Sequence, residues 1–392
     1  SPGGEHHYDD FDVGEALIGR RGRLARPIYF QNVGTIPDSF TCTVLTRKDD
    51  EWVGNLDEEY LDTLSPGEVF VLGGRRFEFR YRRGSKVYVD PTDDRPTVPS
   101  WFSERLPLAP DLGREILDFQ GELLTRLDRG GPPAVREWLR GFPIDENAVY
   151  ALSRLFSEQV AYAGLDSVST PNRLVIEEER DDGEFKRRFY VHSNFGRRFN
   201  DGLGRVVATQ CSRVVDAAVT VAVADHGFTL TMPLNRKVDV AALVRRLEPT
   251  RVRPALRRAL DGTDLLERYF RINATRSLMI LKRYRGHEKS AQRQQVSSEM
   301  LLGYANSLDG FAVMEETYRE ILEDKLDVDR IEAVLSAVQA GELDVIHHVV
   351  ESPTPRAFGL ATLASSEVVI ADDEDDALQA MADRVSESLD ES

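Results

Sequence analysis

The sequence predicts an α+β fold in which small antiparallel β-sheets or β-barrels combine with helical bundles. Two segments, 28–100 and 173–235, show strand-like alternation of apolar and polar residues between glycine-containing turns. The segments 101–172 and 236–370 repeat apolar residues at helical spacing. At 392 residues the chain exceeds what one hydrophobic core usually serves, so we expect two or more packed units.

The first β segment follows residues 1–27, which are polar and rich in glycine and arginine and are predicted to be a linker or the end of a preceding domain. Further along, Phe77, Phe79 and Tyr81 alternate with charged residues. Because side chains alternate across a strand, this pattern places the three rings on one face. We therefore expect residues 28–100 to form a small antiparallel sheet or barrel.

The second β segment contains two hairpin signals. These are Asp181-Asp182-Gly183 and Asp225-His226-Gly227, with a helix expected between them from about Gly196 to Arg213. From Val240 onward the whole pattern is helical, and the acidic tail, 371–392, has a composition typical of disorder.

The composition excludes several classes of protein. The hydrophobic fraction of 41% is that of a folded chain. No apolar run approaches the ~20 residues needed to cross a bilayer, and no signal-peptide pattern is present. Two cysteines, Cys42 and Cys211, are too few for a disulfide framework or a zinc site. We expect both to be small buried residues of a cytoplasmic protein.

The charge is large but unevenly distributed. The formal net charge is −17, and only 7 of the 50 basic residues are lysines, which suggests a salt-adapted, halophilic surface. Net negative charge normally counts against nucleic-acid binding. Residues 245–293, here called the basic belt, nevertheless carry 14 basic and 5 acidic residues, whereas 315–392 carry 21 acidic and 5 basic ones. The belt predicts a phosphate-binding groove, although a solvated helix face would give part of the same pattern.

Catalytic motifs are not visible in the sequence. It lacks a Gly-x-x-x-x-Gly-Lys-Ser/Thr phosphate loop, and we interpret Gly202-x-Gly204 as close packing inside a helix. Asp372–Asp375 is typical of a solvated acidic run, and His347-His348 has no third ligand at metal spacing. His192 and Ser193, as neighbours on a strand, point to opposite faces and do not pair as nucleophile and base. We expect a binding or accessory module with no catalytic residue and no metal site of its own.

A succession of motifs between about residues 20 and 365 resembles Lhr-type (large helicase-related) superfamily 2 helicases of archaea. The motifs are Tyr29-Phe30-Gln31-Asn32-Val33-Gly34-Thr35-Ile36-Pro37-Asp38, Val53-Gly54-Asn55-Leu56-Asp57-Glu58, Leu64-Ser65-Pro66-Gly67-Glu68, Pro99-Ser100-Trp101, Tyr190-Val191-His192-Ser193-Asn194-Phe195-Gly196, Arg276-Ser277-Leu278-Met279-Ile280-Leu281-Lys282-Arg283-Tyr284 and Glu316-Thr317-Tyr318-Arg319-Glu320. Their common order is more specific than any single motif.

The resemblance implies a full-length ATP-dependent 3′-to-5′ helicase that acts on DNA or DNA–RNA hybrids. ATP and Mg²⁺ would belong to motor domains that this chain lacks, and residues 1–27 would end a preceding winged-helix region. The resemblance also implies a DEAD/H-associated domain over 236–370, built with a β-barrel and winged-helix-like helices resembling DNA glycosylases. The expected partners are single-stranded DNA or a DNA–RNA hybrid, and the motor and winged-helix domains of the same polypeptide.

Two residues are expected to touch the tracking strand by this resemblance, Ile36 and Trp101. An indole can stack on any base without sequence readout, contributing ~1–3 kcal/mol per base. An apolar side chain beside Pro37 can wedge between bases. A core role for Trp101 is the alternative.

The cationic candidates fall into two groups. Arg197 and Arg198 are predicted at a helix start, where free N–H groups and positive side chains can meet a phosphate. The other candidates belong to the belt, where we expect about half of the cations to face a phosphate track; they are Arg276, Lys282, Arg283, Arg285, Lys289 and Arg293.

Two other functions stay open at this point. A stand-alone glycosylase-like repair enzyme would use a Gln-x-Gln motif, which Gln292-Arg293-Gln294 matches superficially. A protein-interaction platform would use the acidic C-terminal third to hold a basic partner.

Overall fold

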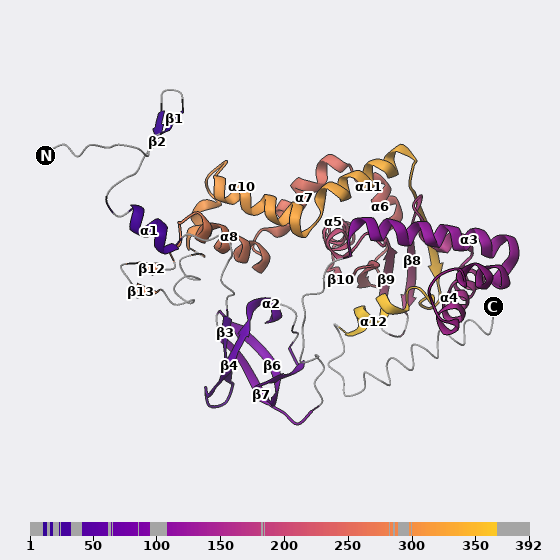
Figure 1. Cartoon of the computed structure of the whole chain (residues 1–392), viewed down its shortest axis with the longest axis horizontal. Coiled ribbons are helices and arrows are strands. Elements are labelled where there is room, and N and C mark those ends of the chain that lie inside the picture. The colour runs from indigo at the N-terminus through magenta and orange to yellow at the C-terminus, as the bar shows by residue number, and fades with distance from the viewer. Residues whose placement is uncertain are drawn as a thin grey trace. The chain divides into compact units, whose positions relative to one another are not determined.

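The computed structural model describes two compact units, each formed from separate stretches of sequence. Unit 1 comprises residues 1–100 and 262–318, and unit 2 comprises 101–261 and 319–392. The residues whose structure is described are 11–13, 16–18, 23, 25–32, 41–61, 64, 66–84, 86–94, 108–181, 183, 185–281, 283–284, 287–288, 298 and 300–366. Figure 1 labels the elements along the chain.

Unit 1 holds two small hairpins, several helices and a five-stranded sheet among its described residues. Its elements are β1 (Phe11–Val13), β2 (Ala16–Ile18), α1 (Ala25–Asn32), β3 (Thr41–Thr46), β4 (Trp52–Asp57), α2 (Glu58–Leu61), β5 (Val69–Leu72), β6 (Arg75–Arg83), β7 (Lys86–Pro91), α8 (Asp264–Arg276), β12 (Arg283–Tyr284), β13 (His287–Glu288) and α10 (Ala312–Arg319), which ends one residue into unit 2.

The sheet of unit 1 has the strand order β4-β3-β7-β6-β5 and curls around an apolar interior. Its neighbours pair antiparallel except for β3 and β7, which are parallel. The interior includes Phe70, Phe77 and Val87, each with no exposed surface. A Cβ atom on Gly54 of β4 would lie 3.1 Å from Leu72 of β5, so the two edge strands approach each other closely.

One side chain leaves the face on which its alternation places it. Phe77 and Phe79 are both buried, whereas Tyr81, which was predicted to share their face, is 46% exposed. The pairing of β6 with β7 shifts register between Phe79 and Tyr81, which leaves Arg80 as the extra residue of a β-bulge. Because a bulge adds one residue to one strand, it moves Tyr81 from the inner to the outer face.

Unit 2 combines helices with a second five-stranded sheet. Its described elements are α3 (Pro110–Leu139), α4 (Glu146–Ala163), η1 (Leu165–Ser167), β8 (Arg173–Asp181), β9 (Lys186–His192), α5 (Arg197–Val215), β10 (Thr220–Ala224), β11 (Gly227–Pro233), α6 (Val240–Arg246), η2 (Pro249–Arg251), α7 (Val252–Leu260), the π-helical turn η3 (Glu320–Lys325), α11 (Val328–Ala340), β14 (Asp344–Val350) and α12 (Phe358–Ser366).

The sheet of unit 2 has the order β10-β11-β9-β8-β14. The prediction that everything after Val240 is helical is therefore wrong, because β14 is a strand of this sheet. β14 pairs parallel with β8, from Asp344 opposite Arg173 to Val350 opposite Glu179. Isoleucine and valine, which favour strands, supply four of its seven residues. The partner strand lies about 170 residues earlier in the sequence, so local periodicity gave no sign of this pairing.

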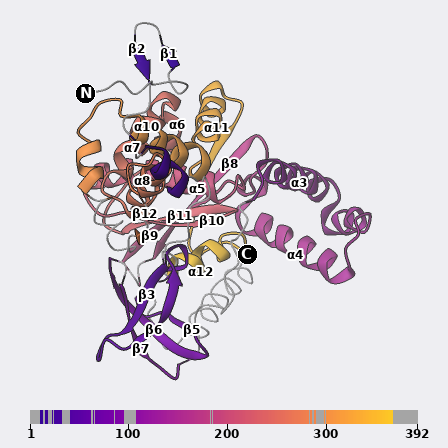
Figure 2. The same cartoon turned by 60° about the vertical axis from the view of Figure 1, so that its left-hand side comes forward.

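Helices cover both faces of this sheet (Figure 2). On β11, Phe228 faces α5, where a Cβ atom on Gly204 would lie 3.3 Å from its ring. The next residue, Thr229, faces α12 and donates its hydroxyl to the carbonyl of Leu360 at 3.3 Å. Alternating residues of one strand therefore serve opposite layers.

The packing interpretation of Gly202 and Gly204 agrees with this structure. A Cβ atom on Gly202 would lie 2.5 Å from the carbonyl oxygen of Leu326 and 2.6 Å from Ile331, so α5 and the start of α11 meet at backbone distance.

The prediction that both cysteines are buried is confirmed. Cys42 lies in the core of unit 1 and Cys211 in α5, where burial raises the pKa of its thiol to about 12. Among the described helices, none combines the length and apolar character that a bilayer crossing requires.

Candidate nucleic-acid interface

The start of α5 is fixed by polar groups from the neighbouring hairpin. The helix begins at Arg197, as predicted, after Gly196 at φ 91°. The backbone N–H of Arg197 donates to Asp225 Oδ1 at 3.0 Å, and the Asn200 side chain donates to the carbonyls of Ala224 and Asp225 at 2.8 and 3.1 Å. The N–H of Arg197 is therefore not free for a phosphate, contrary to the expectation for this position.

The side chains of Arg197 and Arg198 are exposed at this fixed corner. Neither has a hydrogen-bond or ion-pair partner among the described residues. Arg198 lines a cavity of about 220 Å³ with Phe195, Glu323 and Asp327.

The two carboxylates of this cavity are already engaged. Glu323 pairs with Arg253 and Arg319 at 3.3 Å each, and Asp327 pairs with Arg330 at 2.9 Å. The positive charge of Arg198 therefore remains available to an anion.

Three consecutive buried glutamates lie in β8 of the same unit, and they were not predicted from the sequence. Glu177, Glu178 and Glu179 are at most 4% exposed. Charged residues are almost never fully buried unless they are paired, so a run of three glutamates does not by itself indicate a buried strand. The paired arginines of β9, Arg187 and Arg188, were the available signal, because they stand in the next strand of a predicted hairpin.

Each glutamate has its own partners. Glu177 accepts from Thr354 Oγ1 at 2.8 Å and from Gln159 Nε2 at 3.3 Å, and it lies 3.3 Å from His192 Nε2. Glu178 accepts from Arg187 at 2.7 Å.

Glu179 accepts from the Tyr190 hydroxyl, and burial followed by this carboxylate raises the pKa of Tyr190 well above its ordinary value. These groups stabilise the sheet and are closed to a ligand.

The histidine pairs also serve the sheet. The Ser193 hydroxyl bonds the Asn200 side chain, and His192 lies beside Glu177, so Ser193 and His192 form no dyad. His347 lies 3.2 Å from Glu178, and His348 lies 3.5 Å from Asp166. In the described part of the chain, no three metal-ligating side chains come together.

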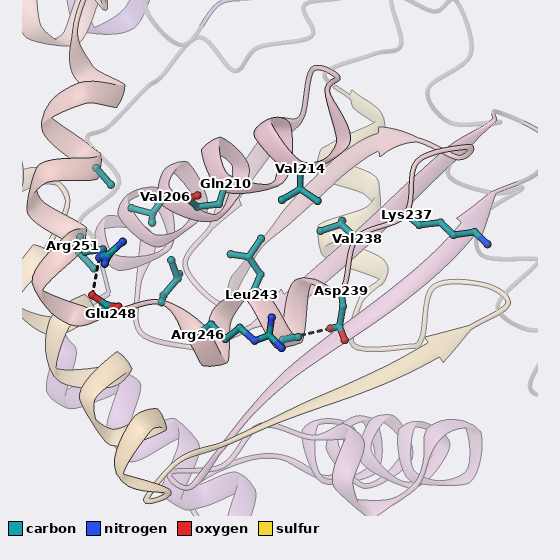
Figure 3. Close-up of a pocket in the computed structure, with 14 residues that line it drawn as sticks. Val206, Gln210, Val214, Lys237, Val238, Asp239, Leu243, Arg246, Glu248 and Arg251 are labelled. Atoms are coloured by element: carbon teal, nitrogen blue, oxygen red, sulfur yellow. Dashed lines mark hydrogen bonds and ion pairs between the residues drawn. The ribbon is translucent and has the colours of Figure 1, made fainter.

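The first part of the basic belt surrounds a larger cavity in unit 2, of about 480 Å³, between α5, α6, η2 and α7 (Figure 3). Its wall is mostly aliphatic, with Leu243 and Val206 pointing inward. Arg251 at its rim pairs with Glu248 at 2.6 Å, whereas Lys237 and Arg246 have no described partner.

Other cations of the belt are committed to structure. Arg253 contacts three carboxylates, those of Glu323, Asp329 and Glu332. Arg271 is 5% exposed. The belt is therefore not one continuous row of free cations within its described residues.

The candidates of unit 1 are only partly described. Arg276 ends α8, is exposed, and lies 3.5 Å from the Asn273 side-chain oxygen. Arg283 lies on β12 opposite Glu288 of β13. The remaining candidates and the Gln-x-Gln motif lie outside the described residues; they are Ile36, Trp101, Lys282, Arg285, Lys289, Arg293 and Gln292-Arg293-Gln294.

Comparison with known proteins places the chain in a family. A DEAD/H associated family model matches residues 168–357, and a model of the large helicase-related protein winged helix domain matches 13–99. ATP-dependent helicase Lhr-Core of Methanothermobacter thermautotrophicus is 38% identical over 93% of this chain and 41% of that protein. ATP-dependent helicase Lhr-Core protein 2 of Thermococcus barophilus is 36% identical over 92% of this chain and 41% of that protein.

A solved structure, Mycobacterium smegmatis helicase Lhr bound to ssDNA and AMP-PNP, resembles the fold with a TM-score of 0.56 and 22% identity. The match covers 68% of this chain and 33% of the solved chain. The chain spans about two fifths of the length of these curated relatives. The chain belongs to the Lhr (large helicase-related) helicase family.

Proposed function

We propose that this chain is the nucleic-acid-binding C-terminal region of an ATP-dependent Lhr-type helicase. It grips and guides single-stranded DNA while a motor moves 3′ to 5′ along the strand and unwinds the duplex, in the cytoplasm. We assign ATP and Mg²⁺ to motor domains of the same polypeptide, since the relatives named ATP-dependent helicases are longer than this chain and the 392-residue sequence contains no phosphate loop.

One observation carries this proposal: two adjacent cations, Arg197 and Arg198, stand free on a backbone that the Asp225 and Asn200 side chains hold in place. A pre-organised cation gives up little conformational freedom when it meets a phosphate, so more of the interaction appears as affinity. The solved relative was captured with ssDNA, which supports a nucleic-acid partner for this family member too.

The test is a salt titration of the 392-residue chain with a labelled oligothymidylate. Log K should fall linearly with log salt, and the double substitution Arg197→Gln/Arg198→Gln should reduce the slope by about 1.4, since each single-strand phosphate contact contributes about 0.7. Arg129→Gln, an exposed arginine of α3 without a described partner, is the control and should leave the slope unchanged.

Absence of binding at low salt, or binding without salt dependence, would exclude strand gripping by this chain. An unchanged slope in the double variant would remove these two residues from the contact.

A further inference from the structure

The outer face of the unit 1 sheet carries a row of large apolar side chains. The register places Trp52 of β4 opposite Leu45 of β3, Leu45 beside Tyr88 of β7, and Tyr88 opposite Tyr81 of β6. Paired residues of neighbouring strands point to the same face. The four side chains, here called the aromatic row, therefore cross four strands in one line, at about 4.8 Å per strand.

Two rings of this row are exposed, and the third, Tyr88, is half-buried. Trp52 is 63% exposed and Tyr81 is 46% exposed, whereas Leu45 between them is buried. The rings of Tyr81 and Tyr88 stack with centroids 4.9 Å apart.

Two β-bulges produce this arrangement. One lies at Arg80 in β6, and the other lies in β4, where the register with β3 shifts between Val44 and Leu45. Bulges re-aim side chains and are frequent at functional sites. Apolar groups that gather on one face mark an interaction surface more often than scattered ones do, and Tyr81 and Tyr88 are in direct contact there.

A row of polar and cationic side chains runs beside the aromatic row. The same register aligns Asn55, Thr43, Lys86 and Arg83 across the four strands. This cationic row contains no carboxylate. Lys86 and Arg83 have no hydrogen-bond or ion-pair partner of their side chains among the described residues.

The carboxylates on the other side of the aromatic row are neutralised. Asp90 accepts from Arg80 at 2.7 Å and from Arg47 at 2.9 Å, and Arg80 also pairs with Glu78 at 2.5 Å. The face thus combines exposed rings with two free positive charges at one border and a closed ion-pair network at the other.

We propose that this face is a binding site for single-stranded nucleic acid. Bases stack on the rings of Tyr81, Tyr88 and Trp52, and the phosphates follow Lys86 and Arg83. Aromatic side chains beside a basic track are the general means of holding a strand without reading its sequence. A protein partner would need acidic side chains of its own to match the two cations. That need would not explain why the exposed rings lie in a line beside them.

The acidic turn before β4 indicates at which end of the face the phosphates lie. Asp49, Asp50 and Glu51 are exposed next to Trp52, so a phosphate is repelled at that end. The strand should therefore lie with its backbone toward the hairpin of Arg83 and Lys86.

This site deepens the proposed function and shares one assumption with it, that the chain binds single strands. The cations of unit 2 and the rings of unit 1 are separate sets of residues, so an experiment can disprove the contact at one set without disproving the contact at the other. The test therefore needs both affinity and the position of the contact.

The experiment uses the 392-residue chain and an oligothymidylate in which one base is 5-iododeoxyuridine, which cross-links to a neighbouring ring on irradiation. Mass spectrometry should locate the adduct on Tyr81, Tyr88 or Trp52. In parallel, Tyr81→Leu/Tyr88→Leu should weaken binding by roughly tenfold or more, the order expected when a base loses its stacking partner.

The matched control is Tyr150→Leu, since Tyr150 is 58% exposed on α4 of unit 2. This variant should bind the oligothymidylate with the affinity of the parent chain. Lys86→Gln/Arg83→Gln should lower the salt slope by about 1.4. Thermal melts of both double variants should match that of the parent chain, because the four substituted side chains lie outside the apolar core.

If the chain binds the strand with adducts only elsewhere and the double tyrosine variant keeps its affinity, the aromatic row is not a strand site, although the proposed function stands. If the chain binds no strand at all, both proposals fail.

Discussion

The two five-stranded sheets of this protein use their charged side chains in opposite ways. The sheet of unit 2 is covered on both faces, and its charges, Glu177 to Glu179 with Arg187 and Arg188, are almost fully buried and bonded to one another or to neighbours. The sheet of unit 1 encloses an apolar core on one face only. On the other face lie Arg80 and Asp90 in ion pairs and Lys86 and Arg83 without a described partner.

This difference separates structural charge from charge that can meet a ligand. A carboxylate or guanidinium inside a covered sheet needs a partner because water is excluded, so its charge is consumed there. On an open face the solvent screens each charge, and a cation without a partner costs little. In this chain the count of arginines therefore says less about binding than the layer in which each one lies.

The largest effect should come from breaking the buried network at Glu177. Glu177→Ala removes the acceptor of Thr354 and Gln159 and leaves His192 without its carboxylate neighbour. We expect a loss of about 3–5 kcal/mol in the free energy of unfolding, measured by urea denaturation.

The control is Glu122→Ala, whose carboxylate is 62% exposed and pairs with Arg126 on α3. It should cost less than about 1 kcal/mol. Similar losses in the two variants would show that burial does not separate the two kinds of charge.

A smaller effect is expected at Gly202, where α5 approaches the backbone before α11 closely. Gly202→Ala would place a methyl group 2.5 Å from the carbonyl oxygen of Leu326, so backbone must shift, at a cost of about 1–3 kcal/mol. Gly121→Ala in α3 meets nothing within 4 Å and should stabilise the chain by about 0.4–1 kcal/mol. Opposite signs in thermal melts would support this picture, whereas equal signs would contradict it.

The smallest effect should come from the ion pairs on the open sheet. Asp90→Asn weakens the contacts of Arg47 and Arg80, yet these side chains keep solvent, so the expected loss is at most about 1 kcal/mol. A loss as large as that of Glu177→Ala would mean that the outer face of unit 1 is not an open surface in solution.

Much of the local structure could be predicted from the sequence. The helix start at Arg197, the hairpins on either side of α5 and the common face of Phe77 and Phe79 follow from turn residues and periodicity, which are local properties. The two glycines of α5 were also interpreted correctly as packing positions, because a glycine inside a helix is costly unless a neighbour needs the space.

Two errors about the strands share one cause, long-range pairing. Strand β14 is held by β8, far away in the sequence, and Tyr81 faces outward because a bulge shifts its register against β7. For the candidate site, the sequence drew attention to Arg197 and Arg198, and it predicted that about half of the belt cations face a phosphate track without distinguishing which ones. The structure shows that Arg253 and Arg271 within it serve the fold.

The sequence by itself determined the family and the mixed α+β class, because ordered motifs and local periodicity are properties of the chain. Only the tertiary structure decided which charges are free. It buried three consecutive glutamates by providing a partner for each, and it aligned Trp52, Tyr88 and Tyr81 from separate strands into one exposed row. Both outcomes depend on which strands lie side by side, and that is settled by packing across the whole unit.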